Sequence, residues 1–86
     1  MKFQGAVIKE QGVTFAIVIV KKSVIDNPSE AMKTIQSLQP LFPGIPVILM
    51  AQDARGVPTY YGKQDIARFM ARIPLQAIPW KEYTTT

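Results

Sequence analysis

Charged and polar side chains that could bind an anion follow the two most apolar segments of the chain, residues 13–20 and 45–51. If these segments are neighbouring parallel strands, their carboxyl ends form the kind of crevice in which α/β proteins bind ligands. A helix that begins at the same rim adds free backbone amides, which suit a phosphate or a carboxylate. The side chains expected there are Lys21, Lys22, Ser23, Gln52, Asp53 and Arg55. The competing interpretation is that they are solvated loop residues, since no glycine-rich phosphate loop accompanies them.

A second group of side chains could contact nucleic acid. Aromatic rings can stack on bases, and two arginines four residues apart on a helix can reach phosphates from one face. The candidates are Tyr60, Tyr61, Lys63, Arg68 and Arg72, with Trp80 as a further ring. The competing interpretation places one tyrosine ring in the core and leaves the basic helix face in water. A formal net charge of +4 favours anionic partners only weakly.

The chain contains no cysteine and no histidine. Disulfides, thiol catalysis, thiolate metal sites and every catalytic triad that needs an imidazole are therefore excluded. Asp53 beside Arg55 and near Tyr60 is the acid–base grouping that remains, and an adjacent arginine makes a carboxylate a weaker base. We therefore expect no catalytic residue, no metal site and no cofactor.

The elements that must position these side chains begin with two central strands. Residues 13–20 and 45–51 are apolar at consecutive positions, which is typical of strands buried on both faces. Residues 3–10 and the glycine turn after them predict a hairpin with the first central strand. We expect this first strand to be the outer member, because Lys9 and Glu10 suit a position nearer an edge than the centre.

A helix is predicted between the two central strands. Asn27 can cap it, Pro28 fits its first position, and Glu30 stands where the acid of a capping box reaches back. Pro40 prevents the helix from continuing. Residues 21–25 are expected to form a polar exit from the preceding strand.

The remaining residues predict a strand, a helix and a final extended segment. Residues 57–61 follow a turn and return as an antiparallel strand. Residues 64–73 have helical spacing until Pro74 ends the helix. Residues 75–83 are expected to be extended, and Pro79 confines them to an edge or a loop on the sheet.

The expected order is ββαββα followed by an extended piece, in a single domain over residues 1–86. It predicts an α+β fold of α/β-like type, with two layers, a mixed β-sheet of four to five strands and two helices. If both helices cover one face, the buried strands leave the other face bare, which is rare on a monomer. Either the helices lie on opposite faces or a second copy covers the bare one, and we favour the homodimer.

From Ile45 onward, the pattern of Ile-Pro, apolar strand, glycine turn, strand, Gly62 and helix resembles the C-terminal half of thioredoxin-like proteins. In that family the proline is cis and borders the active site, so a cis peptide before Pro46 would strengthen the resemblance. It covers residues 45–73, with the preceding strand and the helix at Asn27-Pro28 as a looser match. The family's Cys-x-x-Cys motif is absent and the connecting helix is expected to be longer, so no redox chemistry is carried over.

These observations favour a small non-catalytic interaction or ligand-binding module that acts as a homodimer, with an unknown protein or an anionic small molecule as partner. The alternatives are a small basic nucleic-acid-binding protein and an anion-binding enzyme or sensor at the rim of Lys22, Asp53 and Arg55. No apolar run reaches the roughly 18 residues that span a bilayer, and residues 1–5 lack the apolar centre of a signal peptide. We therefore expect no membrane partner and a cytoplasmic location.

Overall fold

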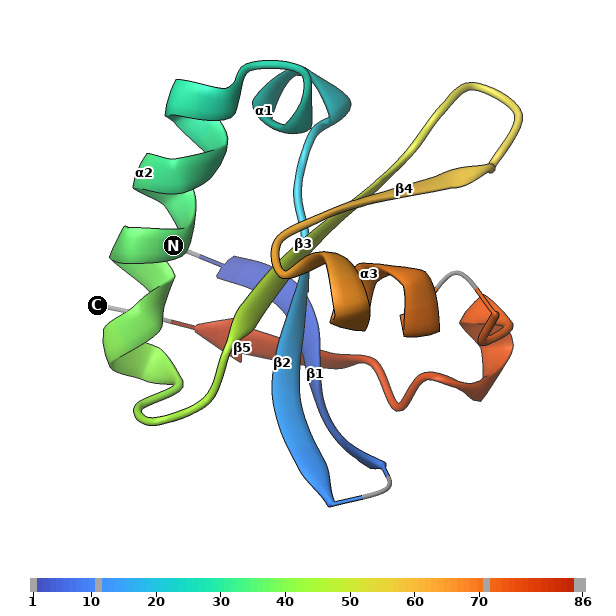
Figure 1. The fold of residues 1–86 in the computed structure, drawn as a ribbon. Helices are drawn as coiled ribbons and strands as arrows, with labels where there is room; N and C mark the ends of the chain where they lie inside the picture. The colour runs from blue at the N-terminus through green and yellow to red at the C-terminus, as the bar shows by residue number, and fades with distance from the viewer. Residues whose placement is uncertain (1, 11, 71, 85–86) are drawn as a thin grey trace.

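The structure is a computed structural model that describes residues 2–10, 12–70 and 72–84. Its strands are β1 (Lys2–Glu10), β2 (Val13–Ile19), β3 (Val47–Gln52), β4 (Pro58–Tyr61) and β5 (Lys81–Thr84). Its helices are α1 (Lys22–Ile25), α2 (Pro28–Leu38) and α3 (Gln64–Met70), with 3₁₀ turns η1 (Gln39–Leu41) and η2 (Leu75–Ala77). The strands form one sheet in the order β4-β3-β2-β1-β5 (Figure 1). The predicted α+β class, the mixed sheet and the order of the elements are confirmed.

The two most apolar segments form the middle of this sheet, as predicted. From Phe15 to Val18 and from Val47 to Ala51, no side chain is more than 4% exposed. The two strands run parallel, whereas the other neighbouring strands pair antiparallel. A segment containing α1 and α2 connects them, which is the crossover that parallel strands require.

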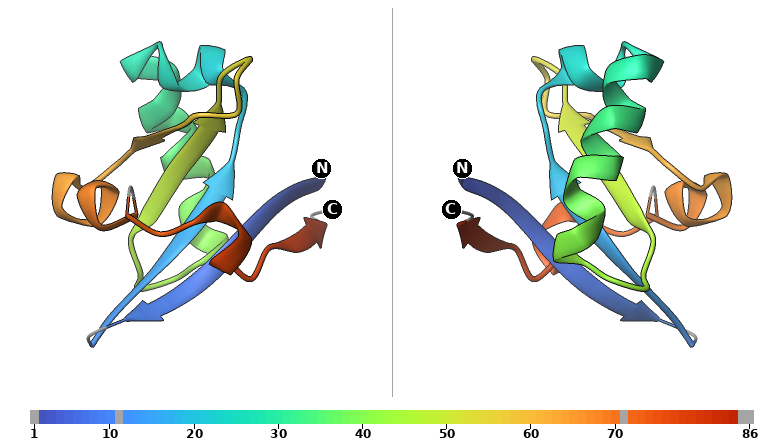
Figure 2. Two further views of the ribbon diagram at one scale, coloured as in Figure 1. Left: turned by 90° about the vertical axis from the view of Figure 1, so that its right-hand side faces the viewer. Right: turned by 90° about the vertical axis from the view of Figure 1, so that its left-hand side faces the viewer.

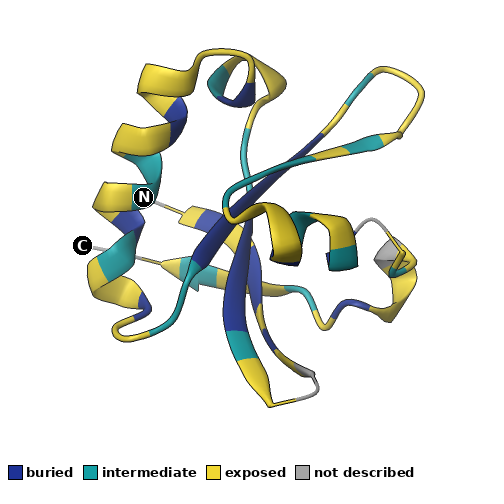
Figure 3. Cartoon of the chain, viewed as in Figure 1, coloured by how far each residue is buried: buried dark blue, intermediate teal, exposed yellow. Residues whose placement is uncertain are grey.

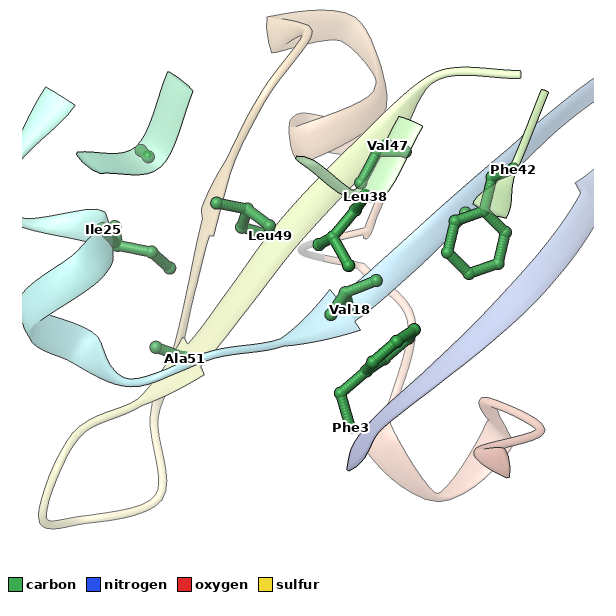
Figure 4. Packing of buried hydrophobic residues seen from close by; sticks show 10 residues of the cluster. Phe3, Val18, Ile25, Leu38, Phe42, Val47, Leu49 and Ala51 are labelled. Carbon is green, nitrogen blue, oxygen red and sulfur yellow. The ribbon is translucent and has the colours of Figure 1, made fainter. Parts of the chain in front are cut away.

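Helices pack on both faces of the sheet, because alternate side chains of each strand point to opposite faces. The α2-side core consists of Phe3, Ala16, Val18, Ile25, Ala31, Leu38, Phe42, Val47, Leu49 and Ala51 (Figure 4). The α3-side core consists of Ala6, Ile8, Phe15, Ile17, Ile48, Met50, Ile66, Met70 and Ile78. Figure 2 shows α2 in front of the sheet in the right view and behind it in the left view, whereas α3 stands to one side of the strands in both.

This arrangement differs from the expected two layers, because the sheet lies between two helical layers. Of the two possibilities left open by the sequence, the helices on opposite faces are the one observed. The sheet has no bare apolar face over the described residues of β2 and β3. The premise that favoured a homodimer is therefore wrong.

The start of α2 follows the predicted capping chemistry in part. The Oδ1 atom of Asn27 accepts hydrogen bonds from the backbone N–H groups of Ser29 at 3.1 Å and Glu30 at 3.4 Å, and Pro28 occupies the first turn. The backbone N–H of Asn27 donates to the carbonyl of Val24 at 3.4 Å, rather than to the Glu30 carboxylate that a capping box would supply.

Residues 21–25, expected as a polar exit from the strand, contain the one-turn helix α1. The backbone N–H of Asp26 donates to the carbonyl of Lys22 at 2.9 Å, which closes the turn. Ile25 is 8% exposed and joins the α2-side core. Burial of this one apolar side chain stabilises a turn that the flanking polar residues alone do not predict.

β1 is the outer member of its hairpin with β2, as predicted, but it is not the edge strand, because β5 pairs beside it. Three rings fix β5 in this place: the ring of Tyr83 stacks on Phe3 at 5.2 Å and meets the edge of Phe42 at 5.4 Å. The β5 pairing extends only from Lys2 to Gly5 of β1. The rest of β1 has β2 on one side and, among the described residues, no strand on the other.

The second helix is shorter than the predicted 64–73. α3 ends at Met70, and the backbone N–H groups of Arg72 and Ile73 donate to carbonyls only three residues earlier, at 3.1 and 3.0 Å. The expected extended segment 75–83 begins with the turn η2, and only its last part forms a strand, β5. The chain needs these turns to travel from the α3 layer back to the sheet edge.

Candidate functional site

The residues of the predicted anion rim follow the carboxyl ends of β2 and β3. On the β2 side of the rim, Lys22 forms part of α1. The Nζ of Lys22 contacts the Oδ1 of Asp26 at 3.0 Å, one turn along the same helix. Lys21 and Ser23 are exposed beside it. Because both partners of the ion pair are exposed, this contact stabilises the helix only slightly.

The other side of the rim forms the loop between β3 and β4. The Oδ1 of Asp53 accepts hydrogen bonds from the backbone N–H groups of Arg55 at 2.8 Å and Val57 at 3.0 Å. The side-chain amide of Gln52 donates to the carbonyl of Gly56 at 3.2 Å. The structure thus brings Gln52 and Asp53 together as turn residues and pairs Lys22 with Asp26 instead of with this loop.

The residues predicted to contact nucleic acid are distributed over different surfaces. Tyr60 packs on the α3-side core and Tyr61 on the α2-side core, so the two rings do not form one stacking platform. Arg72 follows the end of α3 instead of sharing a helical face with Arg68, although both are exposed, as is Lys63. Trp80 also packs against the α3-side core.

Tyr60 carries the one buried side-chain polar atom without a hydrogen-bond partner among the described residues. Its hydroxyl lies on the α3 side of the sheet, in a cluster of aliphatic and aromatic side chains. Burial raises the pKa of Tyr60 above its usual value of 10.0, because the apolar surroundings disfavour the phenolate.

The open part of β1 is a feature that the sequence analysis missed. In an antiparallel pair, the hydrogen-bonding groups of successive residues point alternately to the two sides of the strand. Only two residues separate Glu10 from Val13, its partner across the hairpin, so even-numbered residues of β1 bond to β2 and odd-numbered ones face outward. Gly5 faces β5, whereas Val7 and Lys9 have no strand beside them in the described part of the chain.

Pro79 explains why β5 begins no earlier than Lys81. The last pair between the strands joins Gly5 to Lys81, and the same register would bring Pro79 opposite the next outward-facing residue of β1. Proline has no N–H to donate to the ladder. The chain turns instead, and the N–H of Trp80 donates to the carbonyl of Ile78 at 2.8 Å.

A hollow of about 350 Å³ lies beside this open edge. Its lining is apolar except for one lysine and consists of Val7, Ile8, Lys9, Phe69, Ile73, Ala77, Ile78 and Pro79. We call the open edge at residues 7–9 together with this hollow the β1 groove. Val7 is 43% exposed, and Gly12 and Val13 on the β2 side of the hairpin turn are exposed too, in contrast to the buried middle of the sheet (Figure 3). The sequence signals for the groove are Pro79 and the apolar residues on either side of it.

A second hollow, of about 310 Å³, lies on the α2 side. It is lined by Met32, Ile35, Gln39, Pro46, Val47, Tyr61, Gly62 and Lys63. The amide of Gln39 already donates to the carbonyls of Phe42 at 2.9 Å and Ile45 at 2.6 Å, so it holds the end of η1 against the start of β3.

The described residues contain no cluster of three or more acidic side chains placed to hold a metal ion. Within the same residues, no helix has the length and apolarity to cross a membrane. The described peptide bonds, including the one before Pro46, are trans, and the thioredoxin-like resemblance stays a prediction. Comparison of the chain with protein-family models, with curated proteins and with solved structures finds no match.

Proposed function

We propose that this protein is a non-catalytic interaction module that binds an extended segment of a partner along the β1 groove. The observation that carries the proposal is the outward-facing backbone of Val7 and Lys9 beside a hollow whose lining residues are mostly apolar. Addition of a strand to an exposed sheet edge is a recurrent mode of peptide recognition, in which main-chain hydrogen bonds supply affinity and side-chain pockets supply specificity.

The expected affinity is modest, because the open edge is short. Each main-chain hydrogen bond contributes roughly 0.5–1.5 kcal/mol net, and burial of one large apolar side chain contributes roughly 1.5–3 kcal/mol. Ordering a flexible peptide opposes both contributions. A dissociation constant on the order of micromolar or weaker follows from these magnitudes.

The other functions considered from the sequence have less support from the geometry. Basic and aromatic side chains proposed for nucleic acid lie on separate surfaces, and the rim residues Lys22 and Asp53 already have local partners. A homodimer formed through the same edge is the alternative to a separate partner. We keep the cytoplasm as the expected compartment.

Selection from a random peptide display library, followed by NMR mapping of the selected peptides, tests the proposal. We expect the bound peptides to shift the backbone amide signals of Val7, Lys9 and Ile78 more than those of α2. Val7→Pro removes an outward N–H without removing a bond to β2, so binding should fall at least about tenfold.

Glu82→Pro is the matched control, because Glu82 lies between two residues of β5 that pair with β1 and its N–H faces the outer side. Both variants are first checked for cooperative thermal unfolding. Equal peptide binding by wild type and Val7→Pro, or signal shifts confined to another surface, would contradict the proposal. An empty selection would do the same.

A further inference from the structure

We infer that the occupant of the β1 groove is a short peptide that runs antiparallel to β1 and carries, from N to C, an acidic residue, a large apolar residue and a β-branched residue. This inference rests on the proposed function and specifies the partner. It follows from the direction of the neighbouring strands, the alternation of side chains along β1 and the charge of Lys9.

The direction of the peptide follows from its neighbours. β1 pairs antiparallel with β2 and with β5, and antiparallel ladders are slightly more stable per residue than parallel ones. An antiparallel peptide continues the line of β5, and its C-terminal end meets Lys81, which stands opposite Gly5. The start of β5 therefore limits the peptide to the length of β1 beyond Gly5.

The middle residue of the peptide points into the hollow. Ile8 belongs to the α3-side core, so a peptide residue directly opposite Ile8 projects to the same face of the sheet. There it meets Phe69, Ile73 and Ile78, which line the hollow. A large apolar side chain such as phenylalanine or leucine buries its surface against them, whereas a charged one would be desolvated without a partner.

The two flanking residues of the peptide project to the other face. The residue opposite Lys9 faces an exposed ammonium group that has no carboxylate partner among the described residues. An acidic side chain there forms a cross-strand ion pair, and a lysine would be repelled. The residue opposite Val7 covers a side chain that is 43% exposed, and a β-branched residue fits such a surface.

A second copy of this chain fits the groove less well than a short peptide does. Outward-facing residues pair with one another, so two copies would meet about a two-fold axis near Ile8, with each Lys9 opposite the other copy's valine at position 7. The two lysines would then lie diagonally across the new ladder, on the same face, as like charges.

Four synthetic peptides and matched variants test the inference by isothermal titration calorimetry. The first peptide has the core Glu-Phe-Val, the second Lys-Phe-Val, the third Glu-Ser-Val and the fourth the reversed order Val-Phe-Glu, all with the same neutral flanks and blocked ends. We expect the first to bind at least about tenfold more tightly than each of the others. Lys9→Glu should reverse the preference between the first two peptides.

Lys33→Glu is the control for Lys9→Glu, because Lys33 is exposed on α2 and the change in net charge is the same. Ala77→Trp, which fills the hollow, should weaken the first peptide at least about tenfold. Ala54→Trp on the exposed β3–β4 loop should not. Unchanged binding in Lys9→Glu, or equal binding of the reversed peptide, overturns the inference.

The outcomes separate this inference from the proposed function. If display selection yields groove-binding peptides without the acidic and large apolar residues, the inference is wrong and the proposed function stands. If no peptide binds the groove, both are wrong. If sedimentation shows a dimer that Val7→Pro converts to a monomer, a second copy is the occupant and the inference is overturned.

Discussion

The two edges of the sheet differ in what a single proline does to each. At the β4 edge, the N–H of Asp53 bonds to the carbonyl of Val57, so Thr59 and Tyr61 face β3 and Pro58 faces outward. A proline in that position offers no donor to a neighbouring chain. Pro58 therefore protects the edge on which it lies.

Pro79 has the opposite effect at the other edge. It lies just before β5, at the point where the ladder with β1 would have to continue, and the strand turns away. The donors of Val7 and Lys9 are left without a neighbouring strand in the described part of the chain. A proline within the outer strand protects that edge from pairing with another chain. A proline that interrupts the strand that would have covered an edge leaves the edge available for pairing.

Gly62, where β4 ends, gives the largest expected effect. Its φ is +149°, and a Cβ there would lie 2.5 Å from the Cδ1 of Ile48. Gly62→Ala should lower the free energy of unfolding by about 2–4 kcal/mol, because backbone strain adds to a clash with the core of β3. Chemical denaturation measures this. If Gly62→Ala does not lower the free energy of unfolding, a glycine is not required where β4 ends.

Gly44→Ala is the matched control, because Gly44 also has a positive φ, +79°, but nothing lies within 4 Å of an added Cβ. Its loss should be limited to about 1 kcal/mol, the backbone contribution alone. Equal losses in the two variants would show that contact with Ile48 is unimportant.

Substitution of Tyr60 gives the next largest effect, and it should stabilise the protein instead of destabilising it. Tyr60→Phe removes a buried hydroxyl without a hydrogen-bond partner and should raise the free energy of unfolding by about 1 kcal/mol. Burial in the wild-type fold disfavours the phenolate. The free energy of unfolding is therefore not reduced by ionisation of Tyr60 below pH 10, and it falls as the pH rises through the raised pKa of Tyr60.

Denaturant titrations from pH 7 to pH 11 measure both effects of this substitution. Tyr60→Phe should lose less stability above pH 10 than the wild type does, because it has no phenol to ionise at this position. Tyr61→Phe, on the opposite face of the sheet, is the control and should give no stability gain at pH 7. A destabilised Tyr60→Phe would mean that the hydroxyl has a partner.

Pro79→Thr should convert the open edge of β1 into a covered one. The new N–H stands opposite Val7 in the register of β5, so the ladder can extend by one bonded pair. We expect a stability gain of up to about 1 kcal/mol, slower hydrogen exchange at Val7 and loss of peptide binding. Unchanged exchange at Val7 would show that Pro79 does not limit β5.

Pro58→Thr should have the smallest effect on the stability of the monomer, within about 0.5 kcal/mol, because the new N–H faces water. It should nevertheless increase self-association, since an exposed donor now stands beside that of Tyr60 on the outer edge. Light scattering at increasing protein concentration measures this. Identical scattering by variant and wild type would mean that the β4 edge has another source of protection.

Much of the fold could be predicted from local patterns in the chain. Consecutive apolar residues identified β2 and β3, and the polar and proline residues at 27 and 28 identified the start of α2. The polar site residues could not be placed in this way. Gln52 and Asp53 carry groups that suit a ligand, but the same groups complete a turn, and only the loop geometry decides between the two uses.

The position of β5 and the covering of both faces also lay outside the reach of local patterns. The stacking of Tyr83 on Phe3 joins opposite ends of the chain, and no periodicity within a short window contains that contact. α3 packs on the face of β3 that α2 leaves uncovered. Ile48 and Met50 are as apolar as Val47 and Leu49, so the sequence does not distinguish the two faces.

The sequence alone determined the composition of the sheet's centre, the location of α2 and the absence of cysteine and histidine chemistry, because these depend on residue types and short spacings. The tertiary structure decided which strand edge is covered and which is open. That outcome depends on the register between β1 and β5, which would bring Pro79 opposite Val7 if the ladder continued beyond Gly5 and Lys81. A proline's effect on an edge is fixed by its partner across the ladder, and that partner is distant in the sequence.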